Sequence, residues 1–300
     1  MRVGVVVLPE HRWTDALSIW SEVEELGFSH AWTYDHLSWR SLRGGPWYSP
    51  VPTLTAAAAA TSRITIGTLV TSPNLRHPVT WAQDVMTIDE ISGGRFVAGI
   101  GAGGGGHDAA VLGMPHLSPS RRHKRFREFI ELGDLLLTEK KASYHGEYYT
   151  AVDACLAPGC VQRPRVPFAI AAAGRHALAL AARYAQIWVT NGDPTRFGEL
   201  SEKESWAVIR AQREIFEESC HREGRDPALV ARMLNGSVIV GDPLSSVERF
   251  IDFVGRSRDE GFTDVVIHYP RRSEPFKADH RVFEKIAEVW RPALGEPTPA

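Results

Sequence analysis

The chain has 300 residues, of which 43% are hydrophobic and 23% charged, and its formal net charge is -2 at pH 7. These values are ordinary for a soluble globular protein and give no general electrostatic reason to bind nucleic acid or an anionic membrane. No apolar run approaches the roughly 20 residues of a membrane span. We therefore expect a cytoplasmic protein that acts on a small molecule, with no nucleic acid and no membrane as partners.

The cysteines are few and odd in number, namely Cys155, Cys160 and Cys220. Such a set argues against a disulfide framework. Cys155 and Cys160 have no histidine or second cysteine pair nearby, so we interpret them as free thiols in a loop. The spacing of His116 and His123 fits no zinc pattern either, and we expect no metal site.

The first hundred residues alternate β-branched runs with stretches of helical period. The run "RVGVVVL" predicts a strand, and a helix that ends at Gly27 follows it. The apolar face expected for this helix is formed by Trp13, Leu17, Trp20 and Val23. Next come a strand in "HAWTY", an Ala-rich helix over about 52–61 and a strand in "RITIGTLV". A helix from Pro78 then leads through "SGGR" to the strand "FVAGIG".

The second half repeats this scheme. Strands are predicted in "VPFAIAAA", "QIWVTN", "RMLNGSVIV" and "FTDVVIHY", and the stretches between them have helical period. The helix positions include Phe126, Ile130, Gly133 and Leu137, the segment "RHALALAARYA", residues 199–222, then Val247, Ile251 and Val254, and a last helix to Trp290. Eight apolar strands alternating with helices favour a closed (β/α)8 barrel with loop insertions at its C-terminal face. We expect one domain over residues 1–300, with a Pro-rich tail from about 292.

In such a barrel the active site lies at the C-terminal ends of the strands. Asp35 and His36 directly follow the second strand, and Trp39 and Arg40 come shortly after. A histidine there can act as an acid or base near neutral pH, and the adjacent carboxylate can position it or a ligand. The alternative is a helix-capping Asp beside a surface His.

Small and polar residues end the third strand in "GTLVTSPNLRHP". Glycine and hydroxyl residues let a flat ligand approach the backbone, and Arg76 offers a planar fork of donors to an anion. The alternative is a plain loop into the helix at Pro78, which explains Pro78 but not Arg76.

Two further turns are suited to anions. The stretch "GIGAGGGGHDAAVLGM" follows the fourth strand and is rich in glycine, while Gly174 and Arg175 stand at the start of a helix after the fifth. Exposed backbone N–H groups and a helix N-terminus both favour phosphate, so the pair of turns indicates a phosphorylated cofactor. A flexible lid is the alternative for the glycine-rich stretch. Downstream, Arg121, Arg122, Lys124 and Arg125 indicate a solvated basic patch.

Three segments resemble the luciferase-like flavin and deazaflavin oxidoreductases, a superfamily of (β/α)8 barrels. They are "EELGFSHAWTYDHL", "AAAAATSRITIGTLVTSPNLRHPVTWAQDVMTIDEISGGRFVAGIGAG" and "GRHALALAARYAQIW", in this order and at matching intervals. The resemblance covers nearly all of the chain and weakens only after about Asn191.

The resemblance implies roles for particular residues. His36 would be the catalytic acid or base, and Asp35 would contact the cofactor ring. A non-prolyl cis peptide between Leu69 and Val70, with Thr71 beside it, would support the ring. The remaining cofactor-binding residues would be Gly101, Ala102, Gly103, His107, Ala173, Gly174 and Arg175, and the substrate pocket would include Trp39, Arg40 and Trp188.

The segment "TYDHLSWR" resembles the deazaflavin subgroup, so we expect coenzyme F420 as the cofactor of a hydride-transferring enzyme. We also expect the protein to form a homodimer. An FMN-dependent monooxygenase of the same superfamily is the first alternative. A non-redox barrel enzyme or a cofactor-binding protein without turnover is the second. Some sugar-phosphate dehydrogenases of the family have an acidic glutamate directly after the G-x-G; Gly104 stands there in this chain, so sugar-phosphate oxidation is not implied.

Overall fold

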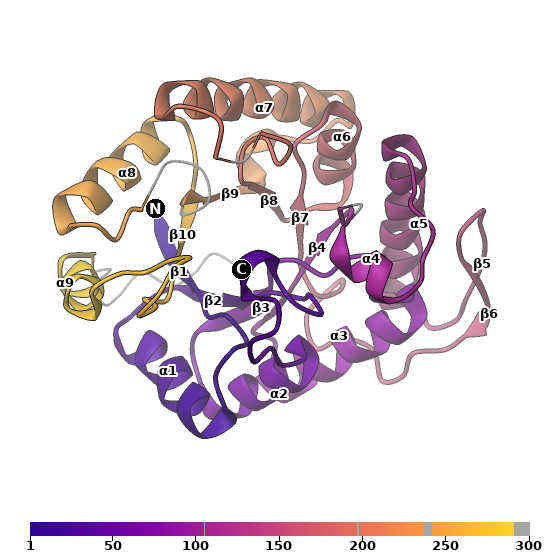
Figure 1. Ribbon diagram of the computed structural model, residues 1–300. Coiled ribbons are helices and arrows are strands. Elements are labelled where there is room, and N and C mark those ends of the chain that lie inside the picture. The colour runs from indigo at the N-terminus through magenta and orange to yellow at the C-terminus, as the bar shows by residue number, and fades with distance from the viewer. Residues whose placement is uncertain (105, 197, 237–241, 291–300) are drawn as a thin grey trace.

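Eight parallel strands close into a barrel, and the helices form a ring around it (Figure 1). The computed structural model describes residues 1–104, 106–196, 198–236 and 242–290. Around the barrel the strands follow the order β1-β10-β9-β8-β7-β4-β3-β2. Their bounds are β1 Arg2–Val6, β2 His30–Thr33, β3 Thr65–Thr68, β4 Phe96–Gly101, β7 Phe168–Ala171, β8 Ile187–Thr190, β9 Ala231–Asn235 and β10 Asp264–His268. The (β/α)8 fold predicted from the alternation of strands and helices is confirmed.

Each barrel strand is followed by helical structure that packs on the outside of the sheet (Figure 1). The helices are α1 Trp13–Glu25, α2 Pro50–Ala60, α3 Pro78–Ser92, α4 His107–Val111, α5 Pro119–Thr138, α6 Arg175–Tyr184, α7 Glu202–Arg222, α8 Val247–Asp259 and α9 His280–Trp290. Among the described residues, no helix combines the length and the apolar character that crossing a membrane requires.

Two elements depart from the simple repeat and were not predicted. The short helix α4 lies between β4 and α5, where the glycine-rich stretch was expected to be a turn or a lid. A two-stranded antiparallel hairpin, β5 Ala142–His145 and β6 Thr150–Ala154, projects beyond α5 (Figure 1). The Pro-rich tail and the end of the strand predicted in "RMLNGSVIV" lie outside the described residues.

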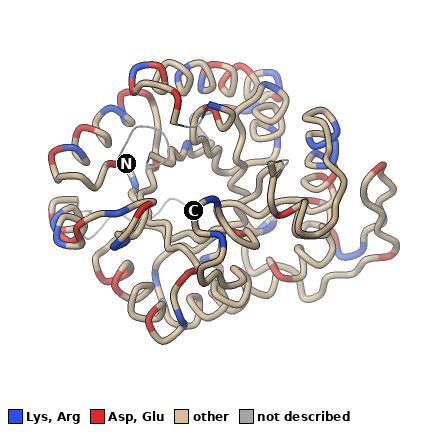
Figure 2. Tube along the Cα trace, viewed as in Figure 1, with Lys and Arg blue, Asp and Glu red and all other residues tan. Residues whose placement is uncertain are grey.

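Successive residues of each strand point alternately into the barrel and toward the helices. The inner group is formed by Val6, Leu8, Trp32, Tyr34, Leu69, Val97, Ala169, Val189, Met233 and Val266. A larger group fills the space between the strands and the helix ring. Charged residues lie mainly on the outer ring (Figure 2). The interior of the barrel is therefore a packed core, and chemistry is confined to its ends.

The placement of Trp188 in the substrate pocket was wrong. Its neighbour Val189 belongs to the inner group, so Trp188 points outward. There it is fully buried and stacks on Phe216 of α7, with ring centroids 4.8 Å apart. Its indole N–H donates to the carbonyl oxygen of Ala172 at 3.0 Å. Trp188 therefore fixes α7 to the sheet and does not line the mouth of the barrel.

Two predicted helix faces were also partly wrong. In α1, Trp20 and Val23 are buried, but Trp13 and Leu17 are 39% and 42% exposed. In α8, Ile251 is 43% exposed, and Phe250, Phe253 and Val254 form the buried side instead.

The N-terminal end of the barrel holds a buried polar cluster. The indole N–H of Trp32 donates to Nδ1 of His30 at 2.7 Å, and Nε2 of His30 lies 3.1 Å from the carboxylate of Asp264. Burial on its own would raise the pKa of Asp264, but the hydrogen bond and charge of His30 and the charge of Arg2 lower it to about 2. Since this end of a (β/α)8 barrel serves stability and the opposite end serves chemistry, His30 is a structural residue.

We predict that Gly99→Ala destabilises the barrel. A Cβ added at Gly99 would lie 1.6 Å from the backbone oxygen of Thr68 on the neighbouring strand, so β3 and β4 would have to separate. The expected loss in the free energy of unfolding is at least about 1–3 kcal/mol. Gly255→Ala is the control, because nothing lies within 4 Å of a Cβ there and alanine in a helix is worth about 0.5–1 kcal/mol. Denaturant unfolding that gave both variants the same sign of change would contradict the close approach.

Candidate active site

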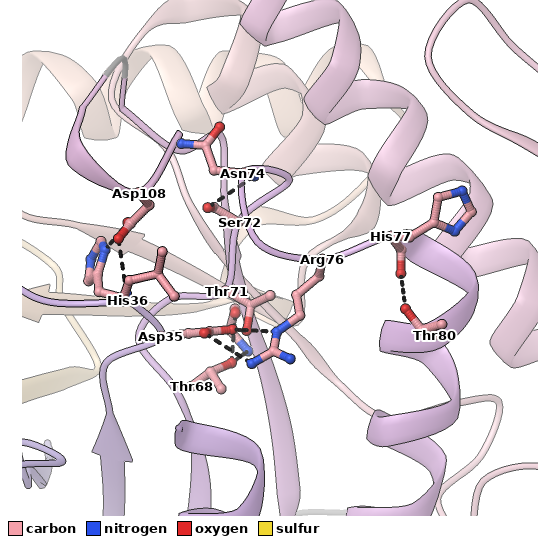
Figure 3. A network of polar contacts seen from close by, with 12 residues as sticks. Asp35, His36, Thr68, Thr71, Ser72, Asn74, Arg76, His77, Thr80 and Asp108 are labelled. Carbon is pink, nitrogen blue, oxygen red and sulfur yellow. Dashed lines mark hydrogen bonds and ion pairs between the residues drawn. The ribbon is translucent and has the colours of Figure 1, made fainter. Parts of the chain in front are cut away.

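A buried carboxylate joins the ends of β2 and β3 (Figure 3). Asp35 follows β2 and is 2% exposed. Its carboxylate accepts a hydrogen bond from the hydroxyl of Thr71 at 2.8 Å and two from the guanidinium of Arg76, each at 3.3 Å. Thr71 and Arg76 both belong to the segment after β3, so the ion pair sets how these two strand ends lie.

This geometry gives Asp35 a structural role, and its contact with a cofactor ring stays a prediction. Both carboxylate oxygens are taken up by Thr71 and Arg76, and the side chain is closed off from solvent. Asp35 holds the segment that begins at Leu69, and the positive charge of Arg76 neutralises the Asp35 carboxylate.

The turn after β3 contains the cis peptide bond expected between Leu69 and Val70. The backbone N–H of Thr71 donates to the oxygen of Gly99 at 2.8 Å, and the N–H of Gly101 donates to the oxygen of Thr71 at 2.9 Å. The turn is thus hydrogen-bonded to β4 on one side and to Asp35 on the other. It presents Val70, which is partly exposed, at the C-terminal end of the barrel.

His36 forms a hydrogen-bonded pair with a residue that sequence reasoning missed (Figure 3). Its Nδ1 lies 2.6 Å from a carboxylate oxygen of Asp108, and the backbone N–H of Leu37 donates to the other oxygen at 2.9 Å. Burial alone would raise the pKa of Asp108, but the hydrogen bonds from His36 and Leu37 and the charge of His36 outweigh it and lower that pKa. A carboxylate that stays ionised and contacts Nδ1 leaves Nε2 as the free nitrogen of the ring within the described residues.

The side chain of His36 is 33% exposed, so a ligand at the barrel mouth can reach it. The only sequence signal for Asp108 was an acidic residue near the start of a short helix after a glycine-rich turn. Because it lies 72 residues from His36, nothing local in the sequence linked the two.

Aromatic residues gather beside His36 at the barrel mouth. The indole of Trp39 lies 5.5 Å from the rings of both Tyr34 and Phe276, and the indole N–H of Trp47 donates to the backbone oxygen of His36 at 2.8 Å. The guanidinium of Arg40 lies over Trp39, 5.1 Å from its ring centroid. Trp39 and Arg40 therefore lie where the sequence placed them, and their contact with substrate stays a prediction.

Below these aromatics, Tyr34 and His268 form a neutral pair. The Tyr34 hydroxyl lies 2.7 Å from Nε2 of His268. Burial lowers the pKa of His268 to about 3, helped by the positive charge of Arg271, and burial raises the pKa of Tyr34. The hydroxyl therefore donates to Nε2, and the floor of the mouth carries hydrogen-bonding groups without charge.

The two turns predicted to bind a phosphorylated cofactor follow neighbouring strands. Gly101 of β4 lies in register with Ala171 of β7. The turn after β4 continues through Ala102 to Gly103, whose φ is +69° and whose missing Cβ leaves room for Asn74. The turn after β7 contains Ala173 and Gly174, the N-cap of α6, and no described residue lies within 4 Å of a Cβ built on Gly174.

Two predicted cofactor residues lie at the edges of this region. The side chain of Arg175 is 59% exposed and lies 3.9 Å from the carboxylate of Glu218 on α7, so its guanidinium is turned toward the helix ring. His107 is the first residue of α4 and adjoins Asp108. Contact of either residue with a cofactor stays a prediction.

We predict that Arg76→Gln destabilises the protein because it leaves the Asp35 carboxylate buried without its cation. The cost should be near the lower end of about 3–5 kcal/mol, since Arg76 itself is 24% exposed. Asp35→Asn combined with Arg76→Gln removes both charges and should recover part of the loss. Arg63→Gln, on an exposed arginine, should change stability by less than about 0.5 kcal/mol. Chemical denaturation measures all three; a double variant no more stable than Arg76→Gln would argue against charge burial as the cause.

Comparison with known proteins places these features in a family. The family model of luciferase-like monooxygenases matches residues 1–296. A protein of Beutenbergia cavernae named F420-dependent glucose-6-phosphate dehydrogenase is 30% identical to this chain, and the match covers 93% of each of the two proteins.

Solved structures share the fold over nearly the whole chain. An F420-dependent secondary alcohol dehydrogenase, in complex with an F420-acetone adduct, has a TM-score of 0.78 at 19% identity, covering 95% of this chain and 97% of that one. The monooxygenase RslO1 from Streptomyces bottropensis has a TM-score of 0.77 at 20% identity, covering 97% and 98%. At this level of identity both likenesses show the fold alone.

Proposed function

The chain belongs to the luciferase-like monooxygenase family of oxidoreductases, and we propose that it transfers a hydride between coenzyme F420 and a small organic substrate. The observation that carries the proposal is the His36–Asp108 pair, which lies at the same barrel mouth as the turn at Leu69 and Val70. The name of the Beutenbergia cavernae relative supports F420 over FMN.

The residues at the mouth fit a cofactor of this kind. Gly104 after β4 and Gly174 after β7 are exposed, and no described residue lies within 4 Å of a Cβ built on Gly174 at the N-terminus of α6. Such a helix terminus offers unpaired donors and a partial positive charge to a phosphate. Gly101, Ala102, Gly103, Ala173 and Gly174 would hold the ribityl and phosphate groups, and Val70 would lie against the ring.

A deazaflavin supplies a ring carbon that accepts or donates a hydride. The chain has to supply the proton. With Nδ1 of His36 donating to Asp108, Nε2 is the nitrogen that takes the proton from a substrate hydroxyl, or returns it to a carbonyl oxygen in the reverse direction. The carboxylate of Asp108 stabilises the imidazolium that forms, and it fixes the orientation of the ring.

The surroundings of His36 favour an apolar substrate. Trp39, Trp47 and Phe276 pack on the inner core at the mouth and would exclude water from the reacting atoms. Gly104 stands at the position where some sugar-phosphate dehydrogenases of the family have an acidic glutamate. In this chain the carboxylate that contacts His36 is that of Asp108. We therefore do not extend glucose 6-phosphate from the relative to this chain, and we propose small alcohols and ketones as the first substrates to examine. The homodimer stays a prediction.

The cofactor assignment predicts selective binding. Titration of the purified protein, followed by fluorescence, should give a dissociation constant in the low micromolar range or below for F420 and a much weaker one for FMN. FMN binding as tight as that of F420 would favour the monooxygenase. Binding of F420 without reduction or oxidation of any tested substrate would favour a cofactor-binding protein.

The His36–Asp108 pair predicts a split between turnover and binding. His36→Ala should lower kcat by roughly 10²–10⁴-fold, and Asp108→Asn by a smaller factor, because the amide keeps the shape but not the charge. Both variants should bind F420 within about twofold of the wild-type affinity. Turnover is measured from the absorbance of F420 with a panel of small alcohols and ketones. Asp15→Asn, on the first turn of α1, is the control, and a loss below tenfold in His36→Ala would exclude His36 as the acid or base.

A further inference from the structure

A pocket adjoins the glycine-rich turn after β4. It has a volume of about 100 Å³ and lies between α4, the loop that follows α4, and the first turns of α5. Its wall includes Asn74, Ala110, Met114, His116, Arg122 and Arg125. None of these residues takes part in the His36–Asp108 pair or in the Asp35 ion pair.

The basic patch predicted on α5 is divided by the structure. Arg121 and Lys124 are exposed, whereas Arg122 is partly buried and Arg125 is 6% exposed. Residues three apart share one face of a helix, and both Arg122 and Arg125 face the pocket. Figure 2 shows the patch as a run of blue on α5. Only part of it is therefore a solvated surface.

The charge inside the pocket comes from these two guanidinium groups. Nη2 of Arg125 donates to the side-chain oxygen of Asn74, but Nε of Arg125 is buried and has no hydrogen-bond partner among the described residues. Among the described residues, no carboxylate forms an ion pair with Arg122 or Arg125. A buried donor without an acceptor is costly, and two guanidinium groups on one wall attract a carboxylate or a phosphate.

Asn74 connects this pocket to the proposed cofactor turn. Its amide N–H donates to the backbone oxygen of Gly104 at 2.9 Å, while its oxygen accepts from Arg125. A Cβ on Gly103 would lie 2.7 Å from the Asn74 amide nitrogen, and Gly104 of the same turn lines the pocket beside Asn74. An extended ligand whose phosphate lies at the turn can therefore reach the pocket.

We propose that Arg122 and Arg125 bind an anionic group on the side chain of the cofactor, beyond its ring and ribityl chain. The inference rests on the proposed function, because F420 supplies two kinds of anion there: a phosphodiester and the carboxylates of the glutamate residues that extend it. Both suit guanidinium groups, and the experiment separates them.

The test compares three ligands by fluorescence titration at low salt: F420 with its glutamate chain, the same molecule without glutamates, and the phosphate-free riboside, by which we mean the deazaflavin ring with its ribityl chain alone. Arg122→Gln should weaken binding of the full cofactor by about tenfold, the effect of one lost charge-assisted contact at a partly exposed site. Binding of the phosphate-free riboside should stay within twofold. Arg121→Gln is the matched control, since it removes the same charge from an exposed position on the same helix.

A loss that disappears when the glutamates are removed assigns the site to their carboxylates, and a loss that persists until the phosphate is removed assigns it to the phosphodiester. Three results would overturn the site while leaving the proposed function intact. In the first two, Arg122→Gln loses the same affinity for all three ligands or loses none for any of them. In the third, Arg121→Gln loses as much affinity as Arg122→Gln. Failure of the wild-type protein to bind any of the three would overturn both.

Discussion

The neutralisation of one buried carboxylate organises the catalytic end of this barrel. An ionised group as closed off as Asp35 requires a partner, since a buried charge without one costs several kcal/mol. Thr71 and Arg76 meet that requirement, and they can do so only when the segment after β3 folds back over the end of β2. His36 is the next residue after Asp35, so the same ion pair fixes the position of the His36 backbone. The hydrogen bond to Asp108 then fixes the orientation of the His36 ring.

The two ends of the barrel use histidine and carboxylate for different purposes. At the N-terminal end, His30 and Asp264 are both almost fully buried, and Trp32 takes up the remaining nitrogen of the His30 ring. That cluster closes the core. At the C-terminal end, His36 is partly exposed and only one of its ring nitrogens is engaged within the described residues. The same pair of residue types thus stabilises one end and leaves a nitrogen available for proton transfer at the other.

The sequence predicted most of what depends on local pattern. The eight strands and the helices between them followed from apolar periodicity, and the position of the cis peptide at Leu69 and Val70 followed from the family resemblance. The face on which Trp188 lies could not be derived in this way. In a strand that is apolar on both faces, the sequence does not show which residues point into the barrel and which point toward the helices. Asp108 was missed because its contact with His36 depends on how the short helix α4 packs over the mouth. The division of the α5 arginines into exposed and pocket-facing residues likewise depends on α4 and the loop after it.

The central claim is that a deazaflavin binds at the mouth between the Leu69–Val70 turn and His36. The Asp35–Arg76 ion pair fixes the positions of these two segments before the cofactor binds. The most direct measurement is a crystal structure of the protein with F420 bound. The account predicts the ring against Val70 with its reactive carbon on the side of His36 Nε2, and Arg76 still paired with Asp35. A ring bound elsewhere, or an Arg76 that has left Asp35 to hold the cofactor, would contradict it.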